Sequence, residues 1–400
     1  MAKTIVFCAD GTWNGPEEAT GKSAIDDGDD SGELPGNQLT NVAKLYNKLS
    51  GTPTPQTKDL VDEQEKVLPA LGGIAVPAQQ VAKYMHGVGD SKNVAEKVLG
   101  GMFGAGIIAR IVRGYTFISR NYQPGDAIYI TGFSRGAYTA RALAGMIARV
   151  GLLNAAKYDI NNKEEAYKRG GAAWLRAKGV TLGGDANSKV NRFLDFVESS
   201  VAKLALSDSD LIPNVPIKAV GVWDTVGSLG VPAYIKGERV DLVRFVDTKL
   251  SDKVERGFHA MAIDEQRADF PVTPWDRRNG IEQVWFSGAH ADVGGGYDKT
   301  NESFISDAAL EWMLKKFARV GLRFDGSLDC TNLPKFLAQV IHSPWTKPPF
   351  NLLEKTPRQP HIEDTFHSTV VARWKGNAGY RPTALAFVTE VNVDRLATQA

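Results

Sequence analysis

Residues 129–143 read Tyr129-Ile130-Thr131-Gly132-Phe133-Ser134-Arg135-Gly136-Ala137-Tyr138-Thr139-Ala140-Arg141-Ala142-Leu143. The centre is a Gly-x-Ser-x-Gly motif, with an apolar, strand-like run before it and an Ala-rich helical run after it. In such a strand–turn–helix unit the serine occupies a strained turn, and the two glycines relieve clashes with the neighbouring strand and helix. The helix N-terminus adds partial positive charge where an oxyanion develops. The motif therefore predicts Ser134 as a nucleophile, with an ordinary structural turn as the alternative.

Apolar runs rich in β-branched residues alternate with amphipathic helical patterns along the chain. The strand-like runs are Thr4 to Cys8, Ala127 to Thr131, Ile217 to Trp223 and Gln283 to Phe286. The helical patterns include Asn41 to Leu49, Ile107 to Arg120, Ala137 to Val150 and Ser306 to Val320. Strands that helices cover on both faces need not alternate polar and apolar residues. The pattern predicts an α/β fold, an α/β-hydrolase-like, doubly wound and mostly parallel sheet.

Two segments interrupt this alternation. Residues 15–37 are acidic and Gly-rich without an apolar period, which indicates a surface loop. Residues 154–213 have helix-forming composition between two predicted core strands, where a short crossover would suffice, and we interpret them as a helical cap or lid. We expect residues 1–400 to form a single α/β-hydrolase domain that carries these insertions.

Charge and cysteine content exclude several classes of protein. The chain has 47 Lys and Arg against 46 Asp and Glu, so it lacks the basic excess of a dedicated nucleic-acid binder. Its two cysteines are too few for a disulfide framework or a zinc cluster. The first apolar run is too short for a signal peptide, and no apolar stretch reaches the roughly 18 residues of a membrane helix. We expect a soluble protein that is cytoplasmic, or secreted without a cleavable signal.

A serine nucleophile needs an orienting carboxylate and a base, which follow it in that order in this fold. Asp224 stands where one apolar run ends, and His290 follows the next predicted strand and precedes three glycines. Because the carboxyl ends of parallel strands carry the site in such sheets, we predict Asp224 as the acid and His290 as the base. A capping or loop role is the alternative for Asp224. Asp292 and His367 are the secondary candidates.

The oxyanion hole of this fold takes one backbone N–H from the residue after the nucleophile and one from a loop after an earlier strand. Those positions are Arg135 and the Gly11-Thr12 turn that follows the first strand-like run. Asp10 stands at the start of that turn, either as a plain turn residue or as part of the site. Spacing alone does not decide between these two roles.

Two patterns resemble binding loops without matching them. Residues 15–23 echo a phosphate-binding loop, but five residues separate the glycines, two glutamates would repel phosphate, and no helix follows. Asp27, Asp29, Ser31 and Gly32 echo a calcium loop, yet its twelfth position is Gln38 rather than Glu. We therefore expect no cofactor and no metal, and leave calcium binding by the acidic loop open.

Four blocks of the chain resemble the signature blocks of the DUF2235 family of α/β-hydrolases, which includes bacterial phospholipase effectors of the type VI secretion system. They are Phe7 to Asn14, Gly132 to Arg141, Trp223 to Ser228 and Gly288 to Tyr297. The resemblance implies a Ser/Asp/His esterase with Ser134, Asp224 and His290 in these roles. It departs at Ala289 and Ala291, where the family more usually has Val and Ser. The accessory regions that effectors use at membranes are not evident either.

Together, these observations predict a serine carboxylic-ester hydrolase that works through an acyl-enzyme. The resemblance implies a lipid-like or phospholipid ester as substrate, transient contact with a membrane surface and, for an effector, a secretion-system or immunity partner. A non-catalytic hydrolase fold that serves as a binding or scaffold module is one alternative. An acyl transferase or amidase that uses the same triad is another.

Overall fold

The computed structural model describes residues 2–11, 39–54, 63–69, 79–85, 102–178, 206–226, 234–235, 238–239, 248–268, 270–297, 304–346, 350–352, 354–396 and 398–399. The predicted acidic loop at 15–37 and the middle of the predicted insertion, residues 179–205, lie outside these ranges. Thr12 also lies outside them.

A ten-stranded sheet forms the centre of the described chain. Its spatial order is β14 (Thr398–Gln399), β13 (Thr365–His367), β12 (Ile281–Phe286), β11 (Val254–Ala262), β8 (Ile217–Trp223), β5 (Ala127–Phe133), β1 (Thr4–Ala9), β4 (Gln80–Met85), β3 (Glu63–Leu68) and β2 (Thr52–Pro53). All neighbours pair in parallel except β4 with β3 and β3 with β2, which are antiparallel. The mostly parallel α/β sheet that the sequence predicts is therefore confirmed.

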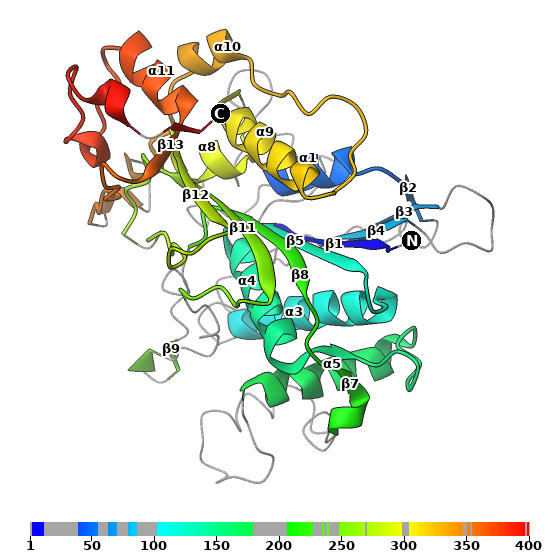
Figure 1. Ribbon diagram of the computed structural model, residues 1–400. Coiled ribbons are helices and arrows are strands. Elements are labelled where there is room, and N and C mark those ends of the chain that lie inside the picture. The colour runs from blue at the N-terminus through cyan, green and yellow to red at the C-terminus, as the bar shows by residue number, and fades with distance from the viewer. Residues whose placement is uncertain are drawn as a thin grey trace, which may run out of the picture.

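Helices cover both faces of this sheet (Figure 1). On one face lie α3 (Met102–Asn121), α4 (Arg135–Val150) and α5 (Lys163–Lys178). On the other lie α1 (Asn41–Lys48), α8 (His290–Gly294) and α9 (Phe304–Arg319). Near β13 the chain adds α10 (Leu333–Ala338) and α11 (Ser368–Gly376). Short two-stranded sheets join β6 (Leu152–Leu153) to β7 (Leu211–Ile212), and β9 (Tyr234–Ile235) to β10 (Glu238–Arg239).

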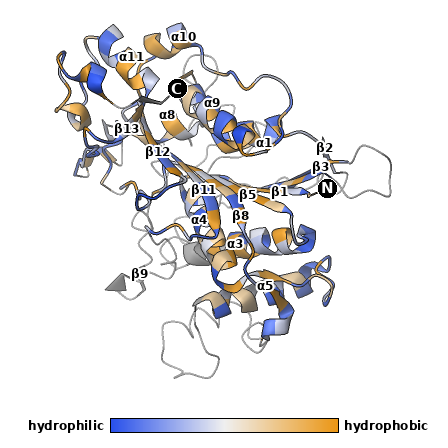
Figure 2. Ribbon diagram, in the orientation of Figure 1, coloured by the Kyte–Doolittle hydropathy of each residue, from blue (hydrophilic) through white to orange (hydrophobic). Residues whose placement is uncertain are grey.

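The core divides by the faces of the central strands. In β1, Ile5 and Phe7 belong to the cluster that contains the helix α3 and α4 side chains, whereas Val6 and Cys8 belong to the cluster with α1 and α9. Both sets are buried, because each face of the strand meets a helical layer. Figure 2 accordingly shows hydrophobic colour along β1 and β5 in the middle of the sheet. A third cluster packs α11 and the last described residues against β12 and β13.

The first part of the predicted insertion joins the main core. In α5, Ala173, Trp174 and Leu175 are buried in the same cluster as α3 and α4. The strands β6 and β7 bring the two described ends of the insertion together. The single-domain organisation and the lid role stay predictions. Within the described residues, no helix is both long enough and apolar enough to cross a membrane.

Candidate active site

Ser134 lies in the sharp turn between β5 and α4. Its φ of 55° and ψ of −122° are strained for a residue with a side chain, and its N–H donates to the Trp223 carbonyl at 3.2 Å. A Cβ on Gly132 would lie 2.3 Å from the Gly136 carbonyl oxygen, and one on Gly136 would lie 2.1 Å from the Ala9 carbonyl oxygen. Both glycines are thus required, and the local geometry is that of a nucleophile elbow.

Asp224 and His290 meet beside this turn. Asp224 follows β8, the strand next to β5, and its side chain is fully buried. His290 begins α8 in the connection after β12 and is only 1% exposed. His290 Nδ1 lies 2.7 Å from Asp224 Oδ2. Beside an ionised carboxylate, the neutral imidazole carries its proton on Nδ1 and has its lone pair on Nε2, which is the tautomer that a general base requires.

Two aromatic rings hold the imidazole. Phe133, the residue before Ser134, packs on His290 with ring centroids 4.6 Å apart, and Phe270 meets it edge-on at 5.1 Å. His290 Nε2 is buried and makes no hydrogen bond with the described residues. Nε2, the nitrogen that would take a proton, is therefore not engaged by another described group, and its ring packs against Phe133, the residue before Ser134.

Arg358 is a contact of the acid that the sequence did not indicate. Its Nη1 donates to Asp224 Oδ1 at 3.3 Å and its Nη2 to Oδ2 at 3.1 Å, while the Ala262 N–H donates to Oδ1 at 3.0 Å. Burial alone would raise the pKa of Asp224, but the Arg358 charge and the His290 hydrogen bond outweigh it and hold that pKa well below its usual range. Asp224 is therefore a carboxylate at neutral pH.

The backbone of His290 has its own acidic support. Its N–H donates to Glu265 Oε2 at 3.1 Å, and Glu265 forms a buried ion pair with Arg267 at 3.0 Å. Burial opposes the charge of Glu265, yet the Arg267 guanidinium lowers the pKa of that carboxyl overall. The first turn of α8 thus carries a fixed anion at its N-terminus.

Asp10 is a fully enclosed acid on the serine side of the site. Its carboxylate accepts hydrogen bonds from Thr40 Oγ1, Tyr84 OH and the Gly11 N–H, the last at 2.6 Å. Burial raises the pKa of Asp10 to about 6, against the lowering effect of these donors. The Gly11 N–H predicted for the oxyanion hole therefore already has an acceptor. Asp10 organises the turn in which the second donor was expected.

The secondary candidates for the base position have other partners. Asp292 Oδ1 binds His342 Nδ1 at 2.6 Å, and its Oδ2 accepts the Ala289 N–H at 3.0 Å. His367 lies at the end of β13, stacks on Phe286 with ring centroids 4.6 Å apart, and places Nδ1 2.8 Å from Thr369 Oγ1. Burial lowers the pKa of His367 to about 4. The hydrogen bonds of Asp292 and His367 therefore go to groups other than Ser134 and Asp224.

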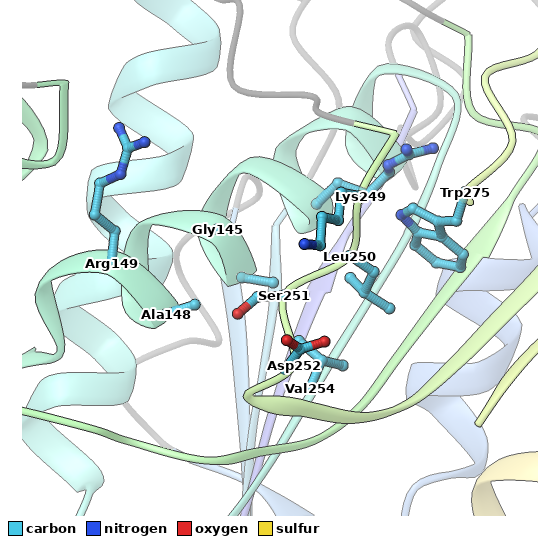
Figure 3. Close-up of a pocket in the computed structure, with 11 residues that line it drawn as sticks. Gly145, Ala148, Arg149, Lys249, Leu250, Ser251, Asp252, Val254 and Trp275 are labelled. Atoms are coloured by element: carbon cyan, nitrogen blue, oxygen red, sulfur yellow. The ribbon is translucent and has the colours of Figure 1, made fainter. Parts of the chain in front are cut away.

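A pocket of about 380 Å³ lies along α4 (Figure 3). Arg141, Ala148, Leu250 and Trp275 are among its lining residues, and none of the three predicted triad residues is. The ring of Trp275 also meets His259 edge-on, with centroids 5.4 Å apart. Among the described residues, no group of three or more His, Cys, Asp or Glu side chains is placed to hold a metal ion.

Comparison with known families identifies the family to which the chain belongs. Residues 3–316 match the model of a family described as the type VI secretion phospholipase effector Tle1-like catalytic domain. The chain belongs to this Tle1-like family. The resemblance to the DUF2235 effectors is thereby confirmed, and the match includes Ser134, Asp224 and His290. Arg358 follows the matched range.

Individual relatives are more distant. An uncharacterized protein of Saccharomyces cerevisiae, YEL023C, is 30% identical over 273 residues, which are 67% of this chain and 32% of that protein. An uncharacterized Pseudomonas aeruginosa protein of known structure is 16% identical with a TM-score of 0.44, over 86% of this chain and 49% of that one. The Tle1 effector bound to the VgrG spike is 17% identical with a TM-score of 0.38, over 74% and 52%. The chain spans about a third of the yeast relative and about half of each solved one.

Proposed function

We propose that this Tle1-like chain is a serine carboxylic-ester hydrolase. The observation that carries the proposal is the buried Asp224–His290 hydrogen bond of 2.7 Å, next to the strained turn of Ser134, with His290 Nε2 left without a partner among the described residues. An acyl-enzyme mechanism needs a nucleophile, a base and a charged group that orients the base, and Ser134, His290 and Asp224 are the residues proposed for these roles.

In the proposed reaction Ser134 Oγ attacks the ester carbonyl while His290 Nε2 takes the hydroxyl proton. The tetrahedral intermediate collapses when Nε2 returns that proton to the leaving alcohol, which leaves an acyl group on Ser134. A water molecule then gives a proton to Nε2 and attacks the acyl carbonyl. The second tetrahedral intermediate collapses when Nε2 gives that proton to Ser134 Oγ, which frees the carboxylic acid and restores the serine. Asp224 keeps Nδ1 protonated and stabilises the transient imidazolium.

The oxyanion receives the N–H of Arg135, the first residue of α4, together with the positive end of that helix. The Gly11-Thr12 turn after β1 is the candidate source of the second donor. At the start of that turn the Gly11 N–H donates to Asp10 Oδ1 at 2.6 Å.

We propose a lipid-like acyl ester, with phospholipids first, as the substrate. Family membership supports this class, since the family description names phospholipase effectors. The chain's net charge of +1 gives no general attraction to an anionic membrane, where each nearby basic residue contributes about 1 kcal/mol. Contact with a lipid surface must therefore come from a local patch. A secretion-system spike or an immunity protein is the corresponding candidate partner.

Active-site labelling and product analysis test the proposal. We expect the purified chain to react with a fluorophosphonate probe, and Ser134→Ala to lose both labelling and turnover. Ser119→Ala is a matched control. Ser119 is a fully buried serine of α3, away from the elbow, and its Oγ accepts a hydrogen bond from the Leu153 N–H. Wild-type chain that neither labels nor cleaves any ester would instead support a scaffold role. Faster cleavage of amides than of matched esters would favour an amidase.

A further inference from the structure

Arg358 makes an end-on, two-pronged contact with the acid of the proposed triad. The two guanidinium nitrogens reach the two carboxylate oxygens of Asp224 at 3.3 and 3.1 Å, and the side chains are 5% and 0% exposed. A fork of this kind fixes the plane of a carboxylate as well as its charge. Oδ2 of Asp224 is shared, because it also binds His290 Nδ1.

The same guanidinium reaches the imidazole by a second route. Arg358 Nη2 donates to the Phe270 carbonyl at 2.6 Å, and the Phe270 ring lies edge-on against His290. The Arg267 guanidinium also packs over the Phe270 ring, 3.7 Å from its centroid. Movement of Arg358 would therefore disturb both the hydrogen-bond partner and the packing partner of His290.

Charge balance in the buried site explains why such a cation is needed. Burial disfavours an unpaired carboxylate. Without another cation nearby, a buried carboxyl next to an imidazole therefore either takes up a proton or forms an ion pair with a protonated imidazole. Protonation of the carboxyl removes the anion that fixes the tautomer of the imidazole, and protonation of the imidazole leaves it unable to accept the serine proton. A guanidinium on both carboxylate oxygens favours the remaining state, an ionised Asp224 beside a neutral His290.

We propose that Arg358 is a positioning residue of the hydrolase site, which holds the Asp224 carboxylate in plane through both of its oxygens and so fixes the orientation and tautomer of the His290 imidazole. The inference rests on the proposed function and adds to it a residue that follows the family-matched range. It also gives the segment after α9 a role in the reaction, through a side chain that contacts the acid of the triad.

Other charged groups surround the pair and limit the size of the effect. Glu265 and Arg267 lie after β11, His259 lies on β11, Asp264 follows it, Asp292 lies on α8, and Arg141 lies on α4. Glu265 and Arg267 compensate each other as an ion pair. Burial lowers the pKa of His259 to about 3, so this ring is neutral in the range where the site works. Arg358 is then the cation in contact with Asp224 among the described residues.

The test compares Arg358→Met with Arg358→Lys on a short soluble ester that the wild-type chain cleaves. We expect Arg358→Met to lower kcat about 100-fold or more with KM within about threefold, as for loss of groups that orient a catalytic histidine. We also expect the acid limb of its kcat/KM profile to move up by about one pH unit or more, because a nearby cation no longer opposes protonation of the base. Arg358→Lys should return the acid limb of the kcat/KM profile most of the way to its wild-type pH and should restore part of kcat.

Arg373→Met is the matched control for a merely structural role. Arg373 is a buried arginine of the same C-terminal segment, and it donates to the carbonyls of Phe336 and Gln339 rather than to the site. Arg373→Met should lower stability and leave the pH profile of the folded protein unchanged. An Arg358→Met variant with the wild-type kcat and acid limb would overturn the proposal. So would an equal loss of kcat in Arg358→Met and Arg373→Met with no shift of the acid limb in either. A wild-type chain without ester turnover would overturn the proposed function itself.

Discussion

Phe133 packs its ring on the ring of His290, with centroids 4.6 Å apart and planes 34° apart. Phe133 ends β5 and His290 begins α8, so this contact joins the strand that presents Ser134 to the helix that presents the base. Gly294 allows the contact, because a Cβ there would lie 2.0 Å from the Phe133 ring. The two reacting side chains of the proposed mechanism are thus supported by one shared aromatic residue.

Substitution of His290 tests the assignment of the base. We expect His290→Ala to reduce kcat at least about 10³-fold, because removal of the base from such a triad leaves only binding and oxyanion stabilisation. Folding should survive, because His290 lies on the short helix α8 rather than in the sheet, and because the buried Asp224 keeps its ion pair with Arg358. Ester turnover and a thermal unfolding curve measure the two effects separately.

His367→Ala is the corresponding control. His367 stacks on Phe286 between β12 and α11, so its loss should lower the free energy of unfolding by about 1–3 kcal/mol while kcat of the folded protein stays near wild type. If His367→Ala abolishes turnover and His290→Ala does not, the triad assigned here is incorrect.

The sheet could be predicted where strands are apolar on both faces. The predicted run Ile217 to Trp223 is β8 residue for residue, and Ala127 to Thr131 extends by two residues into β5. By contrast, none of the predicted runs includes β4 or β11. Lys83 in β4 pairs with Glu63 and Glu65 across the antiparallel edge, and Glu255 and Arg256 open β11 at the solvent. Lys83 has its partners on β3 and Glu255 pairs with Lys218 of β8, and no local pattern shows such partners.

The site divides in the same way. Ser134, Asp224 and His290 each stand next to a strand end, and parallel strands bring such ends to one edge, so local sequence was enough to place them. Arg358 lies between two prolines in a segment without periodic pattern, 134 positions from its partner. A long-range ion pair of this kind leaves no signal in a single sequence, and only the folded chain identifies it.

Substitution of Gly136 tests the elbow. A Cβ at this position would lie 2.1 Å from the Ala9 carbonyl oxygen and 2.5 Å from that of Asp10, and both are backbone atoms that cannot move aside. We expect Gly136→Ala to destabilise the protein by several kcal/mol, roughly 3 or more, and to abolish fluorophosphonate labelling by displacing α4 from β1.

Gly145 provides a control on the same helix. A Cβ there meets nothing within 4 Å, so Gly145→Ala should raise the free energy of unfolding by about 0.5–1 kcal/mol through helix propensity. Equal behaviour of the two variants in urea unfolding would contradict the close approach of α4 to β1.

Asp264 gives the protein a pH-dependent stability that can be measured by itself. Burial, with a smaller contribution from the charge of Asp292, raises the pKa of Asp264 to about 7, against hydrogen bonds from the Gly288 N–H and Tyr380 OH. The folded protein therefore holds a proton between about pH 4 and 7 that the unfolded chain releases. This contribution to stability is complete below about pH 4 and is lost as pH rises to about 7, with a slope of at most about 1.4 kcal/mol per pH unit.

Asp264→Asn isolates that contribution, because the amide oxygen still accepts from Gly288 and Tyr380 but does not titrate. Measured by urea unfolding, the stability of Asp264→Asn relative to wild type should rise from pH 4 to pH 7 and level off above it.

Glu311→Gln is a control of opposite sign. Burial opposes the charge of Glu311, but bonds from Lys315 and the Thr331 and Cys330 N–H groups lower its pKa to about 2. The wild-type advantage over Glu311→Gln should therefore be lost as pH falls below about 4.5. A flat Asp264→Asn difference across pH 4–7 would mean that Asp264 stays ionised in the folded protein, and that the loop before His290 is held by a charge rather than by a carboxylic acid.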